Sequence, residues 1–153
     1  MNKYFKLAAD EAKKTYRNNE GGPFGAVITD KEGNVISIAS NQVLKKCDPT
    51  AHAEIEAIRK ACENLKTHDL SECTIYTTCE PCPMCLSAII WANIKNVYYG
   101  ANKNDAAEIG FRDDYIYKYL ENKDEKTVKL INIDREECLN LFKEYNELSK
   151  EIY

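Results

Sequence analysis

The hydrophobic pattern of the first forty residues predicts a helix followed by a β-hairpin. Over residues 2–18 apolar side chains recur at helical spacing and form one face of an amphipathic helix, made of Phe5, Ala8, Ala12 and Tyr16. The glycine–glycine–proline run that follows ends that helix. Two short apolar runs, Phe24–Thr29 and Val35–Ser40, are separated by the turn-forming sequence Asp30–Asn34. We therefore expect two antiparallel strands joined by a tight turn.

The rest of the chain alternates between helical and strand patterns. Runs of β-branched and apolar residues predict strands at residues 73–78, 96–100 and 128–133. Helices are expected at residues 51–65, 82–93 and 135–153, with a partly helical stretch at 109–120. This order predicts an α/β fold, a three-layer α/β/α sandwich with a mixed central sheet. No repeat or linker interrupts residues 1–153, so we expect a single domain.

The composition is that of an ordinary globular protein, with 44% hydrophobic and 30% charged residues. The formal net charge is −4, and the lysines and arginines are scattered. This argues against a nucleic-acid partner, because a polynucleotide requires a basic face. Residues 1–7 lack the apolar core of a signal peptide, and no apolar run is long enough to cross a bilayer. We expect a cytoplasmic protein with no membrane partner.

Three of the seven cysteines lie within seven residues, at Cys79, Cys82 and Cys85. Such clustering favours a metal site in a reducing compartment over a disulfide framework. Cys82 and Cys85 lie one turn apart at the start of a predicted helix, where the helix dipole favours thiolates. His52, at the start of an earlier predicted helix, adds a third ligand. Two thiolates and an imidazole favour Zn²⁺, with water as the fourth ligand in a catalytic site.

Glu54 lies two residues beyond His52, close enough to face the water on the metal without binding the metal itself. A carboxylate there can accept the water's proton and pass it to a ring nitrogen. His-x-Glu together with Pro-Cys-x-x-Cys is the signature of zinc-dependent nucleobase deaminases. Two other interpretations remain open, an iron–sulfur cluster on the three spaced cysteines and a structural zinc closed by Cys79. The remaining cysteines are interpreted as small buried hydrophobes: Cys47, Cys62, Cys73 and Cys138.

With these motifs in view, the chain resembles the cytidine deaminase superfamily and, within it, the bacterial guanine deaminase branch. The zinc motif indicates the superfamily, and the stretch Asp105–Asp113 indicates the guanine deaminase branch. The resemblance implies that zinc is held by His52, Cys82 and Cys85 and that Glu54 moves protons. It also implies that Asp113 lies near the departing amino group. Other pocket roles that it implies are a purine-reading Asn41, a donating Ala53 backbone amide, and the aromatic residues Phe24 and Trp91.

The activity implied by this resemblance is the zinc-dependent hydrolysis of guanine, a small purine base, to xanthine and ammonia. It also implies a homodimer in which the C-terminal segment, about residues 120–153, is exchanged and Tyr153 closes the partner's pocket. Arg112 stands where an acidic neighbour of Asp113 is expected. The alternatives are a tRNA adenosine deaminase, a deaminase of another small nucleobase, nucleoside or aminated heterocycle, and a non-catalytic zinc-binding module.

Overall fold

A four-stranded mixed sheet lies at the centre of the fold in the computed structural model, which describes residues 2–123, 126–148 and 151–153. The strands are ordered β2-β1-β3-β4. Strand β1 pairs antiparallel with both β2 and β3, whereas β3 and β4 are parallel. The elements are, in chain order, α1 (Lys3–Arg17), β1 (Gly25–Thr29), β2 (Val35–Ser40), α2 (Val43–Lys46), α3 (Ala53–Leu65), β3 (Thr74–Cys79), α4 (Pro83–Trp91), β4 (Asn96–Ala101), α5 (Lys103–Glu108), α6 (Asp114–Asn122) and α7 (Arg135–Glu147).

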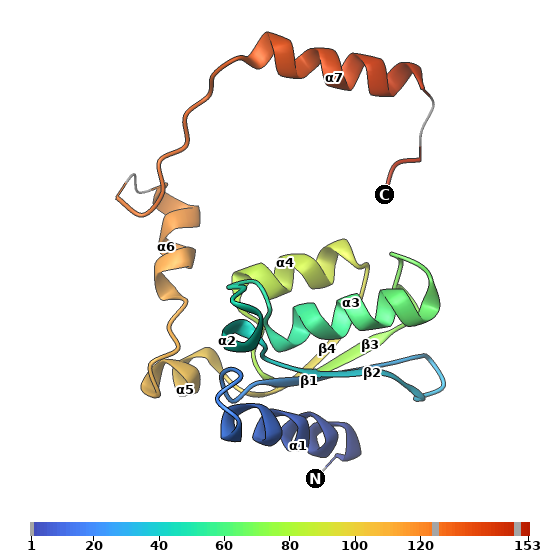
Figure 1. Ribbon diagram of the computed structural model, residues 1–153, viewed down its shortest axis with the longest axis vertical. Helices are drawn as coiled ribbons and strands as arrows, with labels where there is room; N and C mark the ends of the chain where they lie inside the picture. Colours follow the sequence, from blue (N-terminus) through green and yellow to red (C-terminus); the bar gives the residue numbers. More distant parts are fainter. Residues whose placement is uncertain (1, 124–125, 149–150) are drawn as a thin grey trace. The chain divides into compact units, whose positions relative to one another are not determined.

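Helices cover both faces of this sheet, which confirms the predicted three-layer sandwich. Figure 1 shows α1 on one face and α3 with α4 on the other. The core between the sheet and the α3–α4 layer is apolar, and its largest buried side chains include Ile28, Leu70, Ile75 and Ile89. The described residues include no helix that is long and apolar enough to span a membrane.

The hairpin between β1 and β2 forms as its sequence predicts. The Asp30 carboxylate accepts hydrogen bonds from the backbone and side-chain amides of Asn34, both at 2.8 Å. Gly33 adopts φ +83°, a left-handed conformation that glycine reaches without strain. The turn therefore holds the register in which Ala26 faces Ala39 and Val27 faces Ile38.

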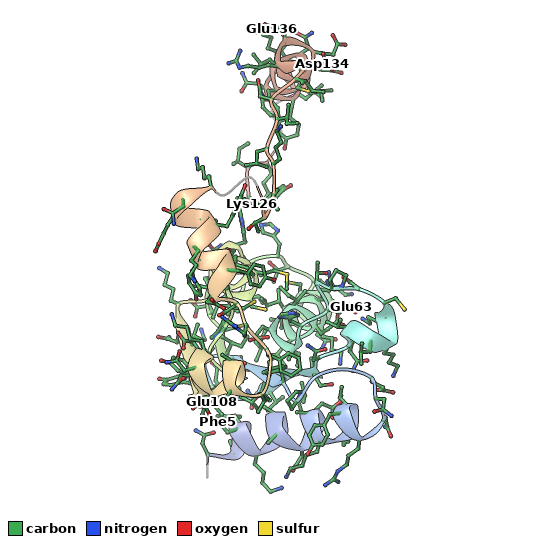
Figure 2. All side chains as sticks on the ribbon, turned by 90° about the vertical axis from the view of Figure 1, so that its left-hand side faces the viewer. Phe5, Glu63, Glu108, Lys126, Asp134 and Glu136 are labelled. Carbon is green, nitrogen blue, oxygen red and sulfur yellow. The ribbon has the colours of Figure 1, made fainter. Side chains whose placement is uncertain are left out.

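Helix α1 packs against the sheet through small residues. Ala8 and Ala12 are buried, and a side chain at Gly25 of β1 would overlap the Ala8 carbonyl. Phe5, on the same helix (Figure 2), meets the Tyr76 ring edge-on at 5.9 Å. The predicted inner face was wrong at its last position. Tyr16 is exposed and Thr15 is buried in its place, where it hydrogen-bonds Ser40, because a helical step of three continues the face from residue 12 to residue 15.

The chain divides into two compact units, Met1–Tyr117 and Lys118–Tyr153. The predicted strand at residues 128–133 is wrong, because that segment is irregular and no strand within the described part of its unit pairs with it. The predicted C-terminal helix ends at Glu147 rather than Tyr153, with residues 149–150 outside the described ranges. The first unit holds the whole sheet and the pocket described below. A single deaminase domain with an exchanged end therefore remains a prediction.

Candidate active site

Two helix N-termini bring the predicted metal ligands together. His52 is the N-cap residue of α3, Cys82 is the N-cap residue of α4, and Cys85 follows in the first turn of α4. Both N-cap residues have extended backbone angles, and Pro83 suits the first position of α4, where no intrahelical donor is lost. Because α3 and α4 pack side by side (Figure 1), three ligands from distant segments converge.

The separations between the ligand atoms fit a tetrahedral zinc ion. The His52 Nδ1 atom lies 3.7 Å from Cys82 Sγ and 3.5 Å from Cys85 Sγ. Zinc–sulfur and zinc–nitrogen bonds of about 2.3 and 2.0 Å, set at a tetrahedral angle, place the two ligand atoms about 3.5 Å apart. All three ligand atoms lie within 4.8 Å of one another. These residues can therefore hold zinc with little rearrangement.

The pKa values of the two thiols are shifted in opposite directions. A hydrogen bond from Cys85 lowers the pKa of Cys82 to about 4, with a further contribution from His52. The same hydrogen bond and burial raise the pKa of the Cys85 thiol well above its usual range. The Cys82 thiolate also raises the pKa of the His52 imidazole. A metal that takes both sulfurs as thiolates must therefore displace the Cys85 proton.

Cys79 does not join the metal-ligand group formed by the described residues. Its thiol donates to the Asn102 carbonyl at 3.8 Å, and burial raises its pKa to about 11. The two interpretations that needed Cys79 as a ligand, an iron–sulfur cluster and a closed structural zinc, therefore find no support in the geometry. Two cysteines expected to be buried, Cys47 and Cys138, are instead exposed. One lies in the loop after α2, and the other lies in a unit whose helix α7 buries no residue.

Glu54 is almost fully buried, yet it lies on the wall of the pocket beside the ligand group. Its Oε1 atom accepts a hydrogen bond from Thr77 Oγ1 at 3.2 Å, and its Oε2 atom accepts one from Cys85 Sγ at 3.5 Å. Burial raises the pKa of the Glu54 carboxyl above its usual value. A carboxylate with a raised pKa can accept a proton and later release it near neutral pH.

The pocket has a volume of about 780 Å³ and is lined by residues of the first unit. Its wall includes His52, Glu54 and Cys82 together with three other predicted site residues, Phe24, Asn41 and Asp113. Phe24 meets Phe111 edge-on, with ring centres 4.9 Å apart. The structure thus gathers side chains from five separate segments of the chain around one cavity.

Asn41 is held in one orientation. Its Oδ1 atom accepts a hydrogen bond from the Val43 backbone amide at 3.1 Å. An amide proton requires an oxygen acceptor, so the Nδ2 group is left as the donor of this side chain. A side chain at Gly21 would overlap the Asn41 carbonyl and Oδ1 atoms, so this close approach requires glycine.

Asp113 lies in the loop between α5 and α6 and is partly buried. Burial is the main cause that raises the pKa of its carboxyl, and the nearby Cys82 adds to the effect. The neighbouring Arg112 donates two hydrogen bonds to the Asp114 carboxylate, both at 3.1 Å. The positive charge next to Asp113 is thus paired with another carboxylate.

Three residues with predicted pocket roles are not among those that line the pocket. Trp91, at the last position of α4, is 73% exposed and is not part of the pocket wall. Tyr153 belongs to the second unit and is exposed. Ala53 is fully buried in the first turn of α3, where backbone amides have no acceptor within the helix. The roles of Trp91, Tyr153 and Ala53 therefore remain predictions.

The profile of the cytidine and deoxycytidylate deaminase zinc-binding region matches residues 1–101, a range that includes the three ligands and Glu54. The chain belongs to this family. Membership in this zinc-binding deaminase family confirms the predicted fold and the predicted zinc cofactor.

Similar proteins extend the match beyond the family region. Guanine deaminase from Bacillus subtilis is 48% identical over 130 residues, which are 84% of this chain and 83% of that protein. An X-ray structure of guanine deaminase from Bacillus subtilis superimposes with a TM-score of 0.92 and 42% identity, covering 100% of this chain and 99% of that one. A tRNA-specific adenosine deaminase from Aquifex aeolicus is 45% identical over 98 residues, which are 64% of each protein.

Two residues of the site escaped the sequence-based prediction. Thr77 supports Glu54, and its signal was the alternation in β3, where Ile75, Thr77 and Cys79 share the buried face. Lys103 lines the pocket at the start of α5, a helix that the hydrophobic pattern did not reveal. Its ammonium group lies 4.6 Å from the centre of the Tyr117 ring, and its backbone amide donates to Glu80.

Proposed function

We propose that this chain catalyses the hydrolysis of guanine to xanthine and ammonia, as a step of purine metabolism. The observation that carries the proposal is the pocket whose wall holds His52, Cys82, a buried carboxylate and an oriented Asn41 amide, with the third candidate zinc ligand, Cys85, buried within 4.8 Å of the other two. The similarity to Bacillus subtilis guanine deaminase, which extends beyond the family region, supports guanine as the substrate. One water adds to C2 of the ring, and the amino group leaves from the same carbon as ammonia.

His52, Cys82 and Cys85 would hold zinc, which supplies a Lewis acid that makes water nucleophilic near neutral pH. Glu54 takes the proton of the attacking water and passes it to the adjacent ring nitrogen. Thr77 keeps the carboxylate turned toward the ligand group. Asp113, on the same pocket wall, helps to protonate the departing amino group.

The base is recognised by donors and by aromatic faces. The Asn41 Nδ2 group can donate to an acceptor on the purine edge, since its Oδ1 atom is engaged with Val43. The Phe24 ring, supported edge-on by Phe111, offers an apolar surface for a flat base. In this proposal the Ala53 backbone amide, in the first turn of α3, adds a further donor.

The second candidate is a tRNA adenosine deaminase, which the similarity to the Aquifex aeolicus enzyme favours. That reaction requires a bound polynucleotide, and the net charge of −4 weighs against it. The same zinc chemistry would serve either base, so the substrate decides between the two candidates.

The test is ammonia release from guanine, guanosine, adenine, cytosine and a tRNA, each incubated with the zinc-loaded protein. Glu54→Gln serves as the inactive variant, and Glu63→Gln makes the same change at an exposed position of the same helix. We expect ammonia and xanthine from guanine only, lost in Glu54→Gln and kept in Glu63→Gln. Inosine formed in tRNA would replace this proposal with the second candidate. Silence on every substrate, with zinc bound, would favour a non-catalytic zinc module.

The exposed apolar side chains of the second unit are the basis for a proposed homodimer. The burial pattern of Lys118–Tyr153 contains no buried residue among those described, and its helix α7 exposes Leu141 and Phe142. We propose that this segment packs against a second copy of the chain and that Tyr153 closes the partner's pocket. Light scattering on the full chain and on a chain ending before Val128 tests this. A monomeric full chain, or full activity after truncation, would contradict it.

We also propose that the protein works in the cytoplasm. All seven cysteines are free of disulfides, as is typical of proteins in a reducing compartment. Fractionation of cells that express the protein, with deaminase activity as the readout, tests this. Recovery of the activity outside the cytoplasmic fraction would contradict the proposal.

A further inference from the structure

Glu56 is a buried carboxylate that the proposed reaction does not use. It lies on α3, one turn after the zinc ligand His52, and is only 3% exposed. Two cations contact it. Lys46 Nζ lies 2.5 Å from its Oε2 atom, and Arg59 NH1 lies 2.8 Å from its Oε1 atom. Burial raises the pKa of this carboxyl, but the hydrogen bonds from Lys46 and Arg59 outweigh burial and hold the pKa below its usual value.

The Arg59 side of this cluster reaches the loop that carries His52. Arg59 lies 3.7 Å from Asp48 Oδ2 and donates to Thr50 Oγ1 at 3.4 Å. Asp48 in turn accepts hydrogen bonds from the Thr50 amide and hydroxyl at 2.8 and 2.7 Å. The His52 amide then donates to the Thr50 carbonyl at 2.7 Å. A continuous set of contacts therefore runs from Glu56 to the backbone of the zinc ligand.

The Lys46 side reaches the pocket wall. Lys46 is the last residue of α2, and two other residues of this short helix, Val43 and Leu44, line the pocket. The Val43 amide also orients Asn41. Helix α2 buries no residue of its own, so polar contacts must hold it in place. The ion pair between Lys46 and the buried carboxylate ties this helix to α3, while Lys45 ties it to Glu20 through its backbone amide at 2.9 Å and its ammonium group at 3.1 Å.

We propose that Glu56 is a positioning residue that holds two parts of the active site in register: the His52 loop through Arg59, and the α2 wall of the pocket through Lys46. It contacts neither the metal nor the base. The negative charge is required because one carboxylate must serve two cations that approach its two oxygens from different segments. A neutral amide keeps the size of this side chain, but its single oxygen can accept from only one of the two cations and its NH2 group faces the other, so the two ion pairs cannot both be replaced.

Zinc affinity tests the Arg59 side without any substrate. The dissociation constant is measured on the apo full chain by competition with a chromophoric chelator. Groups that orient metal ligands change affinity by about 10–100-fold, so we expect Glu56→Gln to bind zinc at least about tenfold more weakly. Glu63 lies on the same helix (Figure 2) but is exposed, and Glu63→Gln should match the parent within about twofold. Equal affinities for the two variants would overturn the proposal.

An effect on zinc affinity that comes only from a less stable fold must be distinguished from one that comes from misplaced zinc ligands. Leu70→Ala opens a cavity in the core at a residue outside the pocket wall, so it lowers the thermal midpoint without touching the cluster. We expect it to keep the parent zinc affinity within about twofold. If it weakens zinc binding as much as Glu56→Gln does, the role of Glu56 is merely structural. Should Glu56→Gln fail to fold, Glu56→Asp keeps the charge and is expected to be intermediate in zinc affinity.

Substituting Arg59 and Lys46 one at a time tests the two contacts of Glu56 separately. Arg59→Met should weaken zinc by about tenfold, whereas Lys46→Met should keep zinc affinity and raise KM by about tenfold with kcat within about twofold. The KM readout rests on the proposed function, but the zinc readout does not. Failure of the parent to deaminate guanine would therefore remove only the KM comparison. Identical effects of the two substitutions on zinc would overturn the assignment of separate sides.

Discussion

The two units of the chain differ in what they bury. The first unit, Met1–Tyr117, encloses an apolar core between its sheet and helices and carries every lining residue of the pocket. The second unit, Lys118–Tyr153, exposes apolar side chains along its irregular segment and along α7. The large apolar residues exposed to more than 60% in the described part of this unit are Leu120, Leu130, Ile131, Ile133, Leu141, Phe142, Ile152 and Tyr153.

This difference separates intrinsic stability from stability that depends on a partner. Full burial of one large aliphatic side chain contributes about 1.5–3 kcal/mol, and among the described residues such burial occurs only in the first unit. The apolar side chains of the second unit gain it only when another surface covers them. We therefore expect the first unit to fold by itself and the second to order through the proposed dimer.

The largest effect is expected from chemistry within the first unit. Glu54→Gln removes the proposed proton carrier but keeps the shape of the side chain, so kcat for guanine should fall by at least about a thousandfold. Zinc should stay bound, because Glu54 is outside the ligand group. Steady-state kinetics and metal analysis on one sample check both statements. Retained activity would remove Glu54 from the mechanism.

The next effect comes from removing most of the second unit. A chain that ends before Val128 should keep its fold and its zinc, because the core and the ligands lie in the first unit. Its kcat/KM for guanine should fall on the order of a hundredfold, since the pocket loses the cover that we propose the partner supplies. Circular dichroism, zinc content and kinetics give the three readouts. Unfolding of the truncated chain would refute the independence of the first unit.

A matched pair of substitutions compares the units directly. Leu70→Ala in the buried core should lower the free energy of unfolding by about 2–5 kcal/mol at any protein concentration. Leu141→Ala on the exposed face of α7 should have no effect on a dilute monomer and a measurable one only where the dimer forms. Denaturant titrations at two protein concentrations separate the cases. A concentration-independent loss for Leu141→Ala would show that this side chain packs within its own chain.

The smallest expected effect is a pH dependence of zinc binding. The raised pKa of Cys85 keeps its thiol protonated at neutral pH, and zinc must displace that proton. Affinity should therefore increase as pH rises, by about tenfold per pH unit where Cys85 alone releases a proton and more steeply where His52, whose pKa is also raised, releases one as well. Chelator competition from pH 6 to 8, on the full and the truncated chain, should give the same slope. Different slopes would mean that the second unit contributes to the ligand group.

Short-range rules made the metal centre predictable. A histidine and two cysteines at helix starts are local features, and the helix N-terminus itself favours the thiolate. The same is true of the hairpin, where Asp30, Gly33 and Asn34 set the turn by contacts within five residues. The candidate zinc ligands, the antiparallel pairing of β1 with β2 and the layer architecture could therefore be predicted from the sequence alone.

The missed features depend on contacts between distant segments. Thr77 supports Glu54 only because the fold brings this residue of β3 next to the first turn of α3, and Glu56 joins α2 to α3 through Lys46. The segment at residues 128–133 has a strand-like pattern but is irregular, because a strand requires a neighbour that the pattern does not supply. The sequence by itself determined which residues can hold zinc. The tertiary structure decided which residues support them, since periodicity and turn chemistry act over a few residues whereas the pocket wall is built from segments far apart in the chain.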